Sequence, residues 1–168
     1  GFGAIAKNVA RRANGFGMKV LAYDPYVKEV PEEFKSFVTL SSIDGIIKNA
    51  DIISMHLPLT DETRDMISAK EMAAMKEGAY IINTARGGIV NEHDLYEAVK
   101  SGHIAGAALD VSEQEPMAED NPLRTLENVI ITPHIGMYSK EAIGAVSLIC
   151  AQNAAAKIEG KELQFQVV

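Results

Sequence analysis

Three side chains that lie far apart in the sequence have the types needed to move a proton and to hold a small acid. His134, in TPHIG, carries a ring that can give or take a proton near neutral pH. Glu115, in SEQEP, could accept a hydrogen bond from that ring and raise its pKa by stabilising the imidazolium. Arg86, in NTARGG, offers a planar fork of donors for a carboxylate and a neighbouring carbonyl oxygen. Taken singly, Arg86 could instead form a surface ion pair, Glu115 could be solvated and His134 could be structural.

The opening segment GFGAIAKNVA has the small-residue spacing of a turn that brings the backbone close to a pyrophosphate. Gly1, Gly3 and Ala6 hold the three positions, and the helical periodicity after them would point a helix N-terminus at the phosphates. Asp24 follows Ala6 after seventeen intervening residues and ends an apolar run. A carboxylate there can accept hydrogen bonds from the adenosine ribose and repel a 2′-phosphate, which favours NAD over NADP. The alternative is a glycine turn followed by a surface aspartate.

Short apolar runs that each end in a polar residue must position these groups. The runs cover residues 18–24, 51–56, 79–86, 104–110 and 129–134, and they end at Asp24, His56, Arg86, Asp110 and His134. Segments with helical periodicity lie at 5–17, 43–50, 69–76 and 91–102, and a longer one at 141–160. This alternation predicts an α/β fold with a doubly wound parallel sheet whose strands are covered on both faces. Because ligands bind at the carboxyl ends of parallel strands, the five polar residues should share one edge.

Patterns within these segments predict local packing. Asn91 is placed to cap the helix that follows it, residues 112–127 are expected to form a surface loop, and residues 164–168 an extended tail. The side chains expected to pack inward are Ile5, Val9 and Ala13 on one face of the first helix, Met66, Met72 and Met75 on later helix faces, and Cys150 in the last helix.

The remaining histidines give no further catalytic centre. His56 is expected to form a local hydrogen bond at the cofactor edge, and His93 and His103 to cap a helix or to be solvated. The cluster NEHD lacks partners at metal-ligand spacing, so we predict no metal site, and the chain has no GxSxG motif for a hydrolase.

The composition limits the classes of protein to which the chain can belong. The 168 residues, 47% of them hydrophobic, can bury one sizeable core. A formal charge of −7 argues against nucleic acid as a partner. No membrane-spanning run or signal peptide is recognisable, so a cytoplasmic location is the default expectation. One cysteine excludes an internal disulfide.

Together the motifs resemble the NAD-binding domain of the D-isomer-specific 2-hydroxyacid dehydrogenases, the family that includes D-3-phosphoglycerate dehydrogenase. The resemblance runs through GFGAIA with Asp24, ADIISMHLPLTDETRDMI, INTARGGIVNEHDLYEAVKSGHIAGAALDV, EQEP and VIITPHIG. It implies a Rossmann-type sheet, NAD as the cofactor, and hydride transfer between NAD and C2 of a D-2-hydroxy or 2-keto acid.

The resemblance also implies roles for individual residues. Arg86 would orient the substrate, His134 would be the general acid or base, and Glu115 would pair with His134. The residues implied at the cofactor are Gly1, Gly3, Ala4 and Ile5 at the pyrophosphate, Asp24 at the ribose, Pro58, then Thr84, Ala85, Arg86 and Asp110 around the nicotinamide, with His134, Ile135, Gly136 and Met137 at its edge.

The family pattern also sets expectations for domains and assembly. Residues 1–160 should form an NAD-binding domain without its first, central strand, which would leave an apolar slot between the neighbouring strands. Residues 161–168 should lead toward a substrate domain that is largely absent, so the chain alone is expected to be poorly active or inactive. A homodimer is expected, with the helices around 90–105 and 138–158 at its interface.

Two departures from the family pattern leave alternatives open. Ala6 replaces the usual third glycine, which such turns can accommodate, and MYSKEA after TPHIG is closer to the subgroup similar to C-terminal-binding corepressors. The second departure argues against assigning phosphoglycerate as the substrate, and it keeps a second hypothesis, an NAD-sensing dimeric binding module. A methyltransferase with a similar glycine turn would have no use for Arg86, Glu115 and His134 together.

Overall fold

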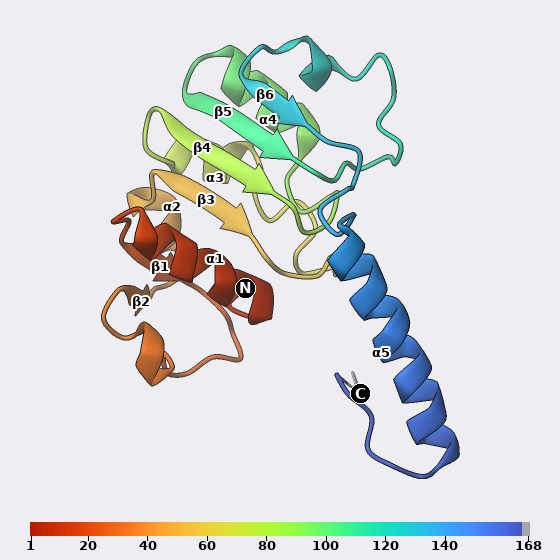
Figure 1. The fold of residues 1–168 in the computed structure, drawn as a ribbon. Coiled ribbons are helices and arrows are strands. Elements are labelled where there is room, and N and C mark those ends of the chain that lie inside the picture. The colour runs from red at the N-terminus through yellow and green to blue at the C-terminus, as the bar shows by residue number, and fades with distance from the viewer. Residues whose placement is uncertain (166–168) are drawn as a thin grey trace. The chain divides into compact units, whose positions relative to one another are not determined.

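The computed structural model describes residues 1–165, which divide into two compact units, Gly1–Pro133 and a second that begins at His134. The first unit holds every strand and four of the helices, and the second holds a turn and helix α5 (Lys140–Ile158). Figure 1 labels these elements. The predicted tail at 164–168 is a turn at Gln164 and Phe165, and its last three residues lie outside the described range.

All strand pairs in the first unit are parallel, which confirms the predicted α/β class. Four strands follow one another in the order β3 (Ile52–Met55), β4 (Ala79–Asn83), β5 (Ile104–Leu109) and β6 (Val129–Ile131). A separate pair is formed by β1 (Val20–Ala22) and β2 (Val38–Leu40), with Val20 opposite Val38. Strand β2 was not predicted from the sequence, because its apolar run of three residues is too short to stand out.

Strands β1 and β3 belong to two different sheets. The amino group of Gly1 donates to the Tyr23 carbonyl just past β1 at 2.8 Å. A Cβ added to Gly1 would collide with the His56 carbonyl just past β3. Gly1 therefore lies between the carboxyl ends of the two strands. The apolar slot expected along this gap stays a prediction.

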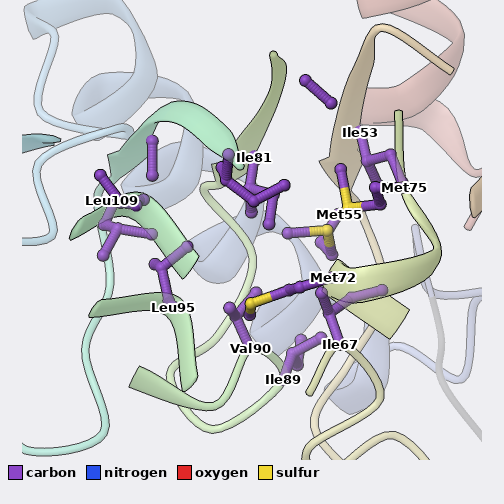
Figure 2. Packing of buried hydrophobic residues seen from close by; sticks show 14 of the residues in the cluster. Ile53, Met55, Ile67, Met72, Met75, Ile81, Ile89, Val90, Leu95 and Leu109 are labelled. Atoms are coloured by element: carbon purple, nitrogen blue, oxygen red, sulfur yellow. The ribbon is translucent and has the colours of Figure 1, made fainter. Parts of the chain in front are cut away.

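Helices α2 (Ile43–Asn49), α3 (Ala69–Ala74) and α4 (Glu92–Lys100) bury one face of the β3–β6 sheet. Figure 2 shows Ile53 and Met55 of β3, Ile81 of β4 and Leu109 of β5 gathered with Met72, Met75 and Leu95. Met72 and Met75 are buried and Met66 packs against this core, which confirms their predicted packing, although only Met72 lies within a helix. On the other face Ile52, Tyr80 and Ile130 are exposed, so the strands are less evenly covered than predicted.

Helix α1 (Ala4–Gly15) packs on a different face from the one predicted. Ala6 and Ala10 are buried with Ala22 of β1, whereas Ile5 is 70% exposed and Val9 41%. The glycine turn fixes how the helix leaves the sheet, and its third small position allows close helix–strand contact. The prediction that Ile5 and Val9 face the core was therefore wrong, because small side chains, not large ones, fill a contact this close.

Side-chain caps explain where most helices begin. Ser42, Asn91 and Ser139 accept the backbone N–H of Gly45, Asp94 and Ala142 at the starts of α2, α4 and α5, which confirms Asn91 as a cap. Helix α3 starts with a capping box of Ser68 and Glu71. Helix α1 differs, because its N-cap is Gly3, which has no side chain to cap with.

The long connections carry two short 3₁₀ helices, Glu32–Phe34 (η1) and Pro122–Thr125 (η2). The predicted loop at 112–127 is confirmed apart from η2, whose Leu123 is buried in the core. In the second unit α5 has no buried residue, and Cys150 is exposed. The prediction of a buried Cys150 was wrong because an apolar helix is buried only where another element covers it.

Candidate cofactor and active site

Gly1 and Gly3 serve different purposes in the opening turn. Gly1 has no room for a side chain because the His56 carbonyl lies where its Cβ would be. A Cβ on Gly3 would meet nothing within 4 Å, so the surface in front of this residue is open. The first glycine thus lets the backbone pass between strands, and the second leaves a ligand free access to the turn.

The N-terminus of α1 is suited to bind an anion. Its Gly3 cap makes no side-chain hydrogen bond to the first-turn N–H groups, in contrast to the capped helices of the chain. Ala4 and Ile5 in that first turn are exposed. The N–H groups and the positive end of a twelve-residue helix dipole therefore point toward accessible space.

Asp24 follows β1 and is bonded directly to the opening turn. Its Oδ2 accepts the Phe2 N–H at 2.8 Å, and its Oδ1 accepts the Tyr26 N–H at 2.9 Å. Partial burial raises the pKa of Asp24, but these N–H donors outweigh it and hold the pKa below its usual value. An ionised carboxylate therefore lies beside the turn, as a ribose acceptor must.

His56 and Pro58 follow β3 on the same edge. The Nε2 of His56 lies 3.0 Å from Ser54 Oγ, which confirms the predicted local hydrogen bond. Burial lowers the pKa of His56, so its ring is neutral at pH 7. Pro58 is exposed, and its carbonyl accepts a hydrogen bond from Thr63 Oγ1 at 2.8 Å. A role for Pro58 at the cofactor stays a prediction.

Arg86 lies three residues past the end of β4, in a loop that also carries the exposed Thr84. Its side chain is exposed, and Nη1 donates to the Ala85 carbonyl at 2.6 Å. The next residue, Gly87, has no room for a side chain because a Cβ there would collide with the Ser112 carbonyl. The Arg86 loop is thus packed against the loop that leads to Glu115.

Asp110 and Glu115 follow β5. Asp110 is only 6% exposed, and its Oδ1 accepts a hydrogen bond from Thr132 Oγ1 at 2.5 Å. Glu115 is exposed and its Oε1 accepts the Ser112 N–H at 3.3 Å. The loop between them is bonded to α4, since Glu92 accepts the Glu113 N–H at 2.6 Å and Glu113 accepts the Glu92 N–H at 3.0 Å.

His134 is the first residue of the second unit and has a positive φ of 54°. Ile135, Gly136 and Met137 form the turn before α5, in which the Tyr138 N–H donates to the Ile135 carbonyl at 2.8 Å. The pairing of Glu115 with His134, which belong to different units, stays a prediction. The other four strand-ending residues, Asp24, His56, Arg86 and Asp110, follow the carboxyl ends of parallel strands in the first unit, as predicted.

Other polar residues have roles that sequence reasoning missed or left open. Asn83, which is 2% exposed, donates to the Arg86 carbonyl, and Thr132 donates to Asp110. Both are polar residues at the end of an apolar run. His103 Nε2 lies 3.0 Å from the Met72 carbonyl in the last turn of α3, whereas the helix that it flanks, and was expected to cap, is α4. His93 is exposed.

No group of three His, Cys, Asp or Glu residues within residues 1–165 is arranged to hold a metal ion. Over the same residues, no helix is both long and apolar enough to cross a membrane.

Replacing Gly87 by alanine should destabilise the protein by about 1–3 kcal/mol, because the new methyl group forces the Ser112 backbone to move. Chemical denaturation monitored by circular dichroism measures the change. Gly15→Ala is the matched control, since a Cβ there meets nothing within 4 Å. Equal stability of the two variants would contradict the packing of the two loops.

Comparisons with known proteins agree with this geometry. Residues 1–136 match the family model described as "D-isomer specific 2-hydroxyacid dehydrogenase, NAD binding domain". The chain is 45% identical over 168 residues to a D-3-phosphoglycerate dehydrogenase of Methanocaldococcus jannaschii, which covers 100% of this chain and 32% of the relative. It is 42% identical over 161 residues to a glyoxylate reductase of Korarchaeum cryptofilum, covering 96% of this chain and 48% of that protein.

A solved D-isomer specific 2-hydroxyacid dehydrogenase of Lactobacillus delbrueckii, in its NAD complexed form, superimposes with a TM-score of 0.88 at 35% identity. That match covers 99% of this chain and 54% of the other. The chain therefore spans about a third to a half of the proteins it matches. The open helix turn beside an ionised Asp24 and the match over residues 1–136 lead to one conclusion: the chain belongs to the D-isomer specific 2-hydroxyacid dehydrogenase family, as its NAD-binding domain.

Proposed function

We propose that this chain is the cofactor domain of an NAD-dependent oxidoreductase that interconverts D-2-hydroxy acids and 2-keto acids. The observation that carries the proposal is the uncapped first turn of α1 joined to Asp24 by the Phe2 N–H. Residues 1–160 would form this domain, and residues 161–168 would lead toward a substrate domain.

The residues present fit NAD. The first turn of α1 would bind the pyrophosphate, and the open surface at Gly3 would admit it. Asp24 would accept hydrogen bonds from the ribose hydroxyls. The residues proposed around the nicotinamide are Thr84, Ala85, Arg86, Asp110, His134, Ile135, Gly136 and Met137. When bound, NAD supplies the hydride acceptor or donor.

The chain's own groups would bind and orient the acid and move its proton. The Arg86 guanidinium would hold the carboxylate and the adjacent C2 oxygen in one orientation. The His134 ring would give the proton to that oxygen on reduction and take it on oxidation. Glu115 would keep the ring oriented and stabilise its protonated form. Arg86 would therefore bind the acid, and His134, supported by Glu115, would transfer the proton.

The substrate class follows from the same groups. Relatives of this chain carry the names D-3-phosphoglycerate dehydrogenase, glyoxylate reductase and hydroxypyruvate reductase. The acids in those names are small and have an oxygen on the carbon beside the carboxylate, which is the pattern a guanidinium fork can hold. The relatives named lend no support to the corepressor-like alternative.

We further propose that the protein is cytoplasmic and forms a homodimer through the helices around 90–105 and 138–158. The apolar exposed residues of α5, which include Ile143, Val146 and Leu148, support the second proposal. The negative charge of the chain argues against nucleic acid as a partner.

Removing the carboxylate of Asp24 should weaken NAD binding and relax discrimination against NADP. In the full-length protein, Asp24→Ala should raise the dissociation constant for NAD about 10- to 100-fold, the cost of losing charge-assisted hydrogen bonds. Isothermal titration calorimetry with both nucleotides measures this. Asp51→Ala is the control, because Asp51 precedes β3 at the opposite edge of the sheet. Unchanged affinity for both nucleotides would rule out the ribose assignment.

The reaction class can be tested with the full-length protein, NADH and a panel of 2-keto acids that includes glyoxylate, pyruvate and hydroxypyruvate. At least one should be reduced, with loss of absorbance at the NADH wavelength. His134→Gln should lower kcat at least about 100-fold, because it removes the proton donor. If no acid of the panel supports NADH oxidation, the proposal of an enzyme is wrong, and the alternative of an NAD-sensing binding module is favoured.

A further inference from the structure

We propose that Asn83 is the positioning residue for Arg86: its side-chain amide holds the loop after β4 in the conformation that directs the guanidinium. The inference deepens the proposed function and rests on it, because there Arg86 orients the substrate. Asn83 is the last residue of β4 and is 2% exposed. It reaches no ligand surface itself, so any effect it has on substrate must pass through another residue.

Both ends of the Asn83 amide are bonded to the Arg86 loop. Its Nδ2 donates to the Arg86 carbonyl at 2.9 Å, and its Oδ1 accepts the Ala85 N–H at 3.0 Å. A buried amide must pair its donor and its acceptor, since an unpaired one carries a large desolvation cost. The loop conformation that satisfies both groups is therefore stabilised over the others.

The guanidinium is tied to the same short segment. Arg86 Nη1 donates to the Ala85 carbonyl at 2.6 Å. Asn83 thus bonds the Ala85 N–H and the Arg86 carbonyl. The guanidinium itself bonds the Ala85 carbonyl, which lies between those two groups. Because these bonds share one backbone segment, a change in the amide contacts would alter the direction of the fork.

Asn83 also joins this loop to its neighbours on the sheet edge. Its backbone carbonyl accepts the Asp110 N–H at 2.9 Å, which links the ends of β4 and β5. Gly87 lies directly against the Ser112 carbonyl, at the start of the loop that carries Glu115. The buried Asn83 thus helps to set the position of the Arg86 loop relative to the loop that follows β5.

The substitution Asn83→Asp removes the side-chain hydrogen-bond donor but keeps the size of the side chain. At neutral pH aspartate offers only acceptors, so the Arg86 carbonyl would lose its donor and face a negative oxygen. Asn83→Asp should lower kcat/KM for the 2-keto acid about 10- to 100-fold, as expected for a misplaced binding group. The KM for the 2-keto acid should rise, since the Arg86 fork binds the acid.

A double-mutant cycle in the full-length protein tests the inference. Asn83→Asp, Arg86→Lys and the double variant are assayed with NADH and the best 2-keto acid of the panel. If Asn83 acts through the fork, its substitution should cost less in the Arg86→Lys background, because an ammonium depends little on direction. Full additivity of the two losses would overturn the inference, as would wild-type kcat/KM in Asn83→Asp.

Asn128→Asp is the matched control. Asn128 Nδ2 donates to the Ala105 carbonyl at 2.7 Å, so the same chemical change removes the same kind of bond. It lies before β6, at the amino ends of the strands, and should leave kcat/KM unchanged. A loss equal to that of Asn83→Asp would show a general stability effect and overturn the inference.

Two further outcomes are distinguishable. Wild-type kcat/KM in Arg86→Lys and also in Arg86→Ala would remove the proposed role of Arg86 and the inference with it. A fall in the Arg86 variants without a fall in Asn83→Asp would remove the inference alone. If thermal melting shows that Asn83→Asp does not fold, Asn83→Ser replaces it in the double-mutant cycle. Failure of both variants to fold would mean that Asn83 is required for folding and would overturn its specific role in positioning Arg86.

Discussion

The hydrogen bond from the Phe2 N–H to the Asp24 carboxylate, at 2.8 Å, is the contact on which the proposed cofactor site depends. It joins the glycine turn to the end of β1, so the uncapped helix N-terminus and the carboxylate are placed together. It also contributes to the lowered pKa of Asp24, because N–H donors outweigh the effect of partial burial on that pKa. One bond therefore brings a positive helix end beside a negative side chain, which is the charge pattern that a dinucleotide's phosphate and ribose require.

A second set of contacts organises the rest of the edge. The backbone carbonyl of Asn83 receives the Asp110 N–H, its side chain holds the Arg86 loop, and Gly87 closes against Ser112. The first and the last of these contacts join the segments that follow β4 and β5. Rigid strands can thus carry functional groups on loops without losing their relative positions, which is the property a site needs if it is to orient a small acid.

The sequence predicted the strand ends well and the packing of helices less well. The polar residues after β1, β3, β4 and β5 were correctly identified because a buried parallel strand must be apolar throughout and stop where solvent begins. The face of α1 was predicted wrongly since the rule that large apolar residues pack inward fails where a close contact admits only Ala6 and Ala10. Cys150 was wrongly predicted to be buried, because an apolar run in a sequence does not reveal whether another element covers it. Asn83 went unnoticed because its importance lies in two side-chain bonds that no spacing rule encodes.

The central claim is that the first turn of α1 and Asp24 form the NAD site. Titration of the isotopically labelled protein with NAD, followed by amide chemical shifts, tests it most directly. We expect the amide signals of Ala4, Ile5 and Ala6 to move most, together with those just after Asp24. In Asp24→Ala the shifts after position 24 should be smaller. Shifts confined to other segments, with the first turn of α1 unchanged at saturating NAD, would contradict it.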